Sequence, residues 1–150
     1  MVVPTGGTAA AMAGLFGAAF GAATILPFQS EFVFVALQLA GTAPVWILVA
    51  VASVGNVLGA CVNYVLGRGI ERFRGRRWFP VTDAQLGRAQ RWYGRYGAWT
   101  LLLSWAPFGD AFTVIAGMMQ LHPALFVALV AVAKTGRYLL LAWATGSAAA

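Results

Sequence analysis

Two long stretches of the chain carry almost no charge, and this feature restricts the possible folds more than any other. Residues 9–67 hold one charged side chain, that of Glu31, and residues 98–147 hold three, those of Asp110, Lys134 and Arg137. Only 9% of all residues are charged, whereas a soluble globular domain carries about 25%. Since 150 residues cannot form a water-soluble surface with so few charges, we predict a single all-α membrane domain over residues 1–150.

The positive charge is concentrated in the polar segment between these stretches. The formal net charge is +6, and residues 68–97 account for all of it with eight arginines and two acids. Basic chains often bind nucleic acid, but this segment is flanked by apolar residues and has no nucleic-acid-binding motif, so no such partner is expected. Because basic loops favour the cytoplasmic side of a membrane, we predict that residues 68–97 face the cytoplasm.

One part of this basic segment has the pattern of an amphipathic helix. Thr82 is a suitable N-cap residue, and Gln85 stands at the capping-box position three residues later. In the helix that follows, Arg88, Arg91 and Arg95 share one face, while apolar residues recur at the same spacing on another. This pattern predicts a helix that lies on an anionic leaflet of the lipid bilayer, and we favour this interpretation over substrate binding.

Length identifies two segments that can span a membrane. Residues 44–67 and residues 123–147 each contain at least 24 mostly apolar residues. A helix of that length crosses a hydrocarbon core of about 30 Å. We therefore predict one transmembrane helix in each of these two segments.

The other two apolar segments are interrupted near their middle. Residues 9–43 contain a break at Pro27, and residues 98–120 contain a break that includes Pro107 and Gly109. The arms on either side of the second break are about ten residues long, which reaches only half of a bilayer. We predict a re-entrant helical hairpin in each segment, and a single kinked transmembrane helix is the alternative.

Matching landmarks recur at a nearly constant offset, which indicates an internal repeat. Pro27 and Pro107 are 80 residues apart, and Pro44 and Pro123 are 79 apart. Each repeat is predicted to consist of one hairpin and one transmembrane helix. Since the basic segment lies between the repeats, the second is inverted relative to the first, and the hairpin tips meet near the middle of the membrane.

The four charges of the apolar stretches fall where these elements can converge. Glu31 and Asp110 follow the two hairpin breaks. Lys134 lies near the centre of the second transmembrane helix, and Arg137 shares its face. An isolated charge at the bilayer centre costs about 2.5–3.5 kcal/mol, so these groups must pair or line water. We predict that Glu31 and Asp110 relay protons and that the two cations bind an anionic headgroup.

Two alternatives assign these charges no role in transport. In the first, they form two buried ion pairs that only hold the hairpins to the helices. In the second, they are assembly contacts in a homo-oligomer. We favour a functional role because a buried ion pair seldom stabilises a protein more than an apolar pair of the same shape.

Polar and small residues on the remaining elements are candidates for the lining of the same site. Asn56 lies near the centre of the first transmembrane helix and shares a face with Asn63, and Gln29 lies beside the first hairpin break. Gly55 and Gly59 have the small-xxx-small spacing that indicates close helix packing. One Cys and one His cannot form a zinc site, and no motif of a nucleophilic enzyme is present. We therefore expect no metal, no cofactor and no enzymatic activity.

Four strings, in this order, resemble one family of bacterial membrane proteins. They are ATILPFQSE at residues 23–31, VGNVLG at 54–59, LLSWAPFGD at 102–110 and KTGRY at 134–138. Their combination resembles the small YqaA-type branch of the DedA family, whose members are also described as VTT-domain or SNARE-associated Golgi-like proteins. The resemblance covers roughly residues 15–145.

The resemblance implies a multi-pass protein of the bacterial inner membrane with two oppositely oriented hairpins. It also implies a proton-coupled transporter or flippase that acts on an anionic lipid or polyprenyl-phosphate headgroup and supports membrane homeostasis. Glu31 matches the glutamate that follows the first hairpin proline of the family. Larger members carry arginines around the second proline, whereas residues 104–110 contain none, and Lys134 and Arg137 can supply positive charge instead. The alternative is an uncoupled lipid scramblase or a structural membrane-organising protein.

Overall fold

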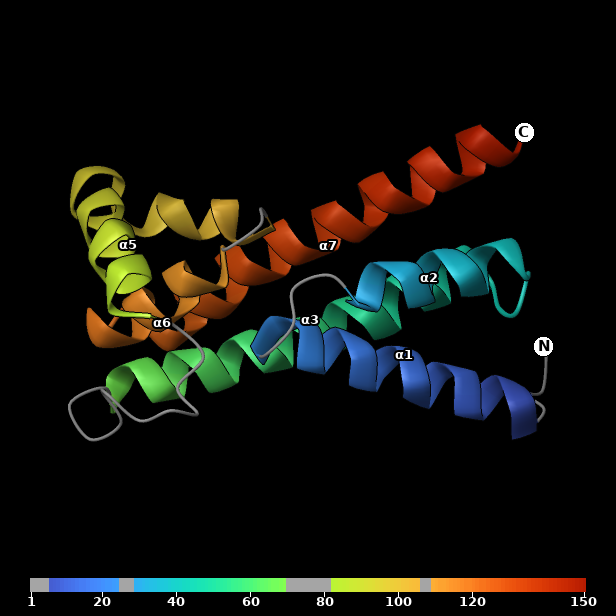
Figure 1. Ribbon diagram of the computed structural model, residues 1–150, viewed down its shortest axis with the longest axis horizontal. Helices are drawn as coiled ribbons and strands as arrows, with labels where there is room; N and C mark the ends of the chain where they lie inside the picture. Colours follow the sequence, from blue (N-terminus) through green and yellow to red (C-terminus); the bar gives the residue numbers. More distant parts are fainter. Residues whose placement is uncertain (1–5, 25–28, 70–81, 106–108) are drawn as a thin grey trace.

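The computed structural model describes residues 6–24, 29–69, 82–105 and 109–150, and within these ranges the chain is helical with no strand. The elements in chain order are α1 (Gly6–Thr24), α2 (Gln29–Leu39), α3 (Val45–Arg68), α5 (Asp83–Tyr96), the 3-10 helix η1 (Gly97–Trp105), α6 (Asp110–Met118) and α7 (Pro123–Ala149) (Figure 1). The predicted all-α fold class is confirmed over this part of the chain.

Three of the helices are long and apolar enough to cross a membrane. They are α3 with 24 residues, α7 with 27 residues, and α1 over Gly6–Ala23. The first two correspond to the predicted transmembrane segments, and each begins at or directly after a proline, Pro44 or Pro123. Proline is common at the start of a helix because the N–H groups of the first turn have no partner within the helix, so the N–H group that proline lacks is not missed there.

The helix α1 is longer than one arm of a half-membrane hairpin. Its 19 residues extend about 28 Å, whereas α2 has 11 residues. The helix continues to Thr24 because residues 6–24 contain neither a proline nor a charge that would end it. By length and composition α1 is therefore a third candidate for a membrane-spanning helix.

The shorter helices divide between the two halves of the long ones. In Figure 1, α1 and α2 lie along the half of the molecule where α3 begins and α7 ends. The elements η1 and α6 lie along the opposite half, where α3 ends and α7 begins. The short helices thus approach the middle of the molecule from opposite ends.

Two main apolar cores follow this division. The first core joins α1, α2, the first half of α3 and the second half of α7, through Leu15, Ala19, Phe34, Leu48, Val49, Ala52, Tyr138 and Ala142. The second core joins η1, α6, the second half of α3 and the first half of α7, through Ala60, Tyr64, Leu101, Ala116, Phe126 and Val130. Burial of these side chains fixes each pair of short helices to its own half of the long ones.

Glycines allow the long helix α3 to approach its neighbours very closely. A Cβ atom at Gly59 would lie 2.6 Å from the Cβ of Ala23 on α1, and one at Gly55 would lie 2.7 Å from the carbonyl oxygen of Phe16. The predicted small-xxx-small packing is thereby confirmed, with α1 as the partner. At its other end, α3 crosses α6 where Gly67 meets Val114 and Gly117.

The helix α5 forms part of the basic segment. It ends at Tyr96, and Gly97, with φ of +66°, turns the chain into η1. Only glycine adopts this left-handed conformation without strain. Tyr93 packs against Ala111, Val114 and Ile115, so part of the apolar face of α5 lies on α6 rather than on a bilayer. The burial of Tyr93 raises the pKa of its phenol.

Candidate functional site

Four charged side chains form two ion pairs that connect short helices to α7. The Nζ atom of Lys134 lies 2.7 Å from Oδ1 of Asp110. The Nε atom of Arg137 donates to Oε1 of Glu31 at 2.7 Å, and its Nη2 atom contacts the same oxygen. We call these residues the four-charge site. The structure therefore brings together the four charges that the sequence singles out.

Helix geometry explains why each charge stands where it does. Glu31 lies in the first turn of α2, and Asp110 is the first residue of α6. Carboxylates are stabilised at these positions because the backbone N–H groups of a helix N-terminus present partial positive charge. Lys134 and Arg137 are three residues apart on α7, so they share a face and each meets one carboxylate.

The two pairs differ in burial. The side chain of Lys134 is 1% exposed and that of Asp110 is 25% exposed. In the other pair, Arg137 is 17% exposed and Glu31 is 31% exposed. Lys134 thus places its charge in an apolar surrounding with Asp110 as its partner, while the Glu31–Arg137 pair is the more accessible of the two.

Both pairs lie between the two apolar cores. On α7, Lys134 follows Val130 of the second core by one turn, and Tyr138 of the first core comes one turn later. On α3, the buried Asn56 stands between Ala52 of the first core and Ala60 of the second. The charged and polar groups therefore form a band across the middle of the molecule.

One half of this polar band surrounds the start of α2. The hydroxyl of Tyr138 donates to Oγ of Ser30 at 2.9 Å. The Nδ2 atom of Asn56 lies 3.3 Å from the Tyr138 hydroxyl oxygen and 3.2 Å from the carbonyl oxygen of Ala19. These contacts join α1, α2, α3 and α7 directly beside Glu31 and Arg137.

The other half surrounds the end of α1 and the start of α6. The Nδ2 atom of Asn63 donates to the carbonyl oxygen of Ala23 at 2.8 Å and lies 3.2 Å from Oγ1 of Thr113. Thr113 in turn donates to the backbone oxygen of Asp110 at 2.6 Å. Since the last carbonyl groups of a helix have no partner within it, Asn63 satisfies one of them at the end of α1.

Several buried oxygen atoms in this part of the chain accept no hydrogen bond. Among the described residues, they include Oδ1 of Asn56, Oδ1 of Asn63, Oγ of Ser53 and Oγ of Ser104. A buried polar atom without a partner is costly, so these oxygens are available to a bound proton donor such as water or a ligand hydroxyl. Within the same ranges, no group of three His, Cys, Asp or Glu side chains could hold a metal ion.

Other residues that the sequence predicts for the site do not contact the four charges, or lie outside the residues that the structure describes. Asn56 and Asn63 contact backbone and hydroxyl groups rather than the four charges. The hairpin breaks Pro27 and Pro107 and the side chain of Gln29 lie outside the described residues. Gly109 is described, and a Cβ atom there would lie 2.7 Å from the Cα of Ser104 on η1.

Sequence reasoning missed three polar residues of the band, namely Ser30, Thr113 and Tyr138. Each has a positional signal that could have identified it. Ser30 precedes Glu31, Thr113 follows Asp110 by three residues, and Tyr138 follows Lys134 by four. Residues three or four apart on a helix share a face, which applies to Thr113 and Tyr138, whereas the signal for Ser30 is only its place next to Glu31.

Replacing Asn63 with Leu is expected to destabilise the protein by about 1–3 kcal/mol. The substitution removes the donor to the Ala23 carbonyl oxygen and leaves that buried acceptor unsatisfied. Thermal unfolding in detergent, followed by circular dichroism, measures the effect. Val62→Leu, a substitution at the exposed neighbouring position, is the control, and an equal loss in both variants would contradict a specific role for the Asn63 amide.

The sequence profile of a family described as the VTT domain matches residues 3–146. The chain is 39% identical to "Inner membrane protein YqaA" of Escherichia coli (strain K12) over 132 residues, which are 87% of this chain and 88% of that protein. The protein of the same name from Shigella flexneri gives the same values.

A protein of Haemophilus influenzae is 37% identical over 119 residues, which cover 72% of this chain and 70% of that protein. No solved structure matches the chain. The family profile covers most of the chain, including all residues of the four-charge site.

Proposed function

The chain belongs to the VTT-domain (DedA) family of membrane proteins, and we propose that it is a proton-coupled transporter or flippase of the bacterial inner membrane. Its substrate is an anionic lipid, with a phospholipid or polyprenyl-phosphate headgroup. The inner-membrane location is supported by the printed name of its relatives and by three helices with the length and composition of membrane spans.

The observation that carries this proposal is the pairing of both carboxylates with two cations on one face of α7. Both pairs lie between the apolar cores, where charge is costly. An ion pair in such a place seldom adds more stability than apolar side chains of the same shape. Stability alone therefore does not account for the four charges. A function in which a lipid phosphate replaces the carboxylates as partner of the two cations does account for them.

The proposed cycle is a competition between carboxylate and lipid phosphate for the same cations. A proton that binds Glu31 neutralises its carboxylate and leaves the guanidinium of Arg137 free to bind a phosphate. A proton on Asp110 frees Lys134 in the same way. When the protons leave toward the other side of the membrane, the ion pairs form again and the headgroup is released.

The arrangement of the helices supports an inverted repeat in which α2 and the pair of η1 and α6 approach the middle of the membrane from opposite faces. α1 with α2, and η1 with α6, each occupy one half of the molecule (Figure 1). The nine residues of η1 extend about 18 Å, which is less than the thickness of a hydrocarbon core. With residues 68–97 on the cytoplasmic side, α3 runs inward and α7 runs outward, as expected for an inverted repeat.

The test is a reconstituted assay with a pH gradient. Purified full-length protein is placed in liposomes with a fluorescent phosphatidylglycerol, and translocation is followed by chemical quenching of the outer leaflet. We expect a gradient to accelerate translocation by the unmodified protein. Glu31→Gln and Arg137→Gln are each expected to reduce the gradient-dependent rate at least about tenfold, since a loss of about 1.4 kcal/mol corresponds to that factor.

Asp83→Asn is the matched control, because it removes an exposed carboxylate on α5 outside the four-charge site. It is expected to leave the rate unchanged. Translocation that is equally fast with and without the gradient would contradict proton coupling and support an uncoupled scramblase. Normal gradient-dependent rates in both site variants would contradict the proposed site.

A further inference from the structure

A cationic cavity lies on the exposed side of α5, on an element that contributes none of the four-charge residues. Its volume is about 240 Å³, and its lining consists of Arg88, Arg91, Trp92, Arg95 and Tyr96. Three of these five residues carry a positive charge and none carries a negative one. The cavity is therefore suited to an anion.

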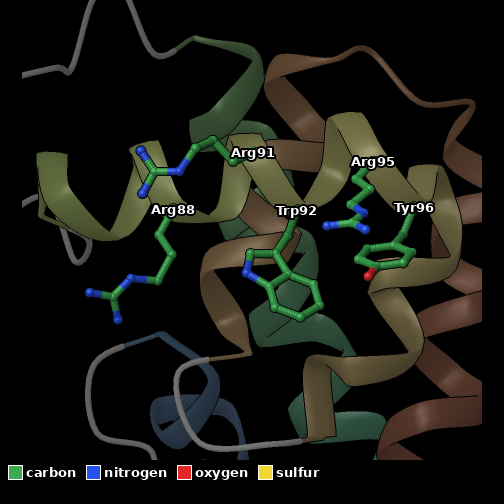
Figure 2. A pocket seen from close by; sticks show the side chains of 5 residues that line it. All are labelled: Arg88, Arg91, Trp92, Arg95 and Tyr96. Carbon is green, nitrogen blue, oxygen red and sulfur yellow. The ribbon is translucent and has the colours of Figure 1, made fainter.

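Two aromatic side chains, Trp92 and Tyr96, lie among the three arginines (Figure 2). Figure 2 shows Arg88 and Arg91 on one side of the Trp92 indole and Arg95 with Tyr96 on the other. The guanidinium carbon of Arg95 lies 5.6 Å from the centre of the Tyr96 ring, within the range of a cation–π contact. The Trp92 and Tyr96 rings are 5.1 Å apart between centres and tilted by 31°.

An apolar groove continues from this cavity onto η1. It has a volume of about 210 Å³ and is lined by Trp92, Tyr96, Trp99, Thr100 and Leu103. Trp92 and Tyr96 line both spaces, and the turn at Gly97 brings η1 next to α5. None of the residues that line the groove is charged, so it is suited to a hydrocarbon chain rather than to more of a polar headgroup.

We propose that the cavity and the groove together bind one anionic phospholipid, with its phosphate among the three arginines and one acyl chain along η1. A free phosphate would use only the cationic part and leave the groove unused. A zwitterionic headgroup would bring an ammonium group toward three guanidinium groups, which repel it. This discrete site goes beyond general attraction of a basic helix to a membrane surface.

Native mass spectrometry of the full chain in detergent, titrated with short-chain phosphatidylglycerol, tests the proposal. We expect one lipid per chain to bind tightly at this site, apart from any lipid that binds at the four-charge site. The triple variant Arg88→Gln/Arg91→Gln/Arg95→Gln is expected to lower the affinity at least about tenfold. The matched control removes three arginines of the same basic segment, Arg72→Gln/Arg74→Gln/Arg76→Gln, and is expected to keep the affinity within about twofold.

Equal losses in the two triple variants would overturn the site, because binding would then depend only on total charge. Two further arms distinguish the ligand sources. Glycerol phosphate and short-chain phosphatidylcholine are both expected to bind at least about tenfold more weakly than phosphatidylglycerol. Equal affinity for glycerol phosphate would show that the groove binds no acyl chain, and equal affinity for phosphatidylcholine would show that the arginines do not select an anion.

A second variant keeps the charges and changes only the groove. Trp99→Ser/Leu103→Ser is expected to weaken binding of phosphatidylglycerol while leaving that of glycerol phosphate unchanged. Circular dichroism of each variant checks that the helices are retained. If this variant binds phosphatidylglycerol as tightly as the unmodified chain, the acyl-chain part of the proposal is wrong. Both the site and these outcomes are independent of the transport activity proposed for the four-charge site.

Discussion

Replacing Asp110 with Asn is expected to abolish proton-dependent lipid translocation and to destabilise the protein by about 3 kcal/mol. Lys134 is 1% exposed and its Nζ atom pairs with Asp110. Without the carboxylate, the protein must bury an uncompensated charge or deprotonate the amine, and both cost free energy. The figure is at the lower end of the usual range because Asp110 is 25% exposed. Thermal unfolding in detergent and the liposome assay measure the two effects.

A double variant separates the structural effect from the transport effect. Asp110→Asn/Lys134→Met removes both charges, so we expect stability to return to within about 1 kcal/mol of the unmodified protein. Translocation is expected to remain absent, because neither a proton acceptor nor a cation is restored. If the double variant regains both stability and gradient-dependent transport, this pair serves only to hold α6 on α7. Glu31→Gln provides the comparison for stability, since its pair is more exposed and its loss should cost less.

Replacing Gly67 with Ala is expected to destabilise the protein by about 1–3 kcal/mol. A Cβ atom at Gly67 would overlap the carbonyl oxygen of Val114, and one at Gly117 would overlap that of Tyr64. Backbone atoms of packed helices cannot move aside as a flexible side chain can, so α3 and α6 must separate. Their separation would also displace Asp110 at the start of α6 from Lys134 on α7.

The control for this prediction is Gly136→Ala on α7. A Cβ atom there meets nothing within 4 Å, and alanine is the better helix former by about 1 kcal/mol. We therefore expect Gly136→Ala to be neutral or slightly stabilising, and Gly67→Ala to be destabilising despite the same gain in helix propensity. Unfolding temperatures that rise equally in both variants would show that the α3–α6 crossing tolerates a methyl group.

The long helices and the members of the four-charge site could be predicted from the sequence because local rules determine them. Pro44 and Pro123 indicate where two apolar runs begin, and the spacing of Lys134 and Arg137 fixes their common face. The pairing of acids with bases could not be read in this way. It depends on α2 packing on α7 and on α6 packing on α3 and η1, which only the tertiary arrangement determines.

The conformation of the short helices also could not be predicted from the sequence. Residues 97–105 form a short apolar run whose pattern does not distinguish an α-helix from the observed 3-10 helix. The hydrogen bonds of Asn56 and Asn63 to α1 require the close approach that Gly55 and Gly59 permit. The spacing of Gly55 and Gly59 predicts a close approach of another helix. It does not predict that this helix is α1 or which carbonyl groups of α1 accept the hydrogen bonds.

The polar groups of α2 are translated long before their partners on α7. Gln38, Ser30 and Glu31 bond to residues of α7 that are 104, 108 and 106 positions later. A ribosome adding about 5–20 residues per second needs roughly 5–20 s to make that length of chain. Residues 9–67 contain no basic side chain, so this apolar stretch offers Glu31 no cationic partner during this interval. The polar groups of α2 therefore gain their partners on α7 only after about a hundred further residues have been translated.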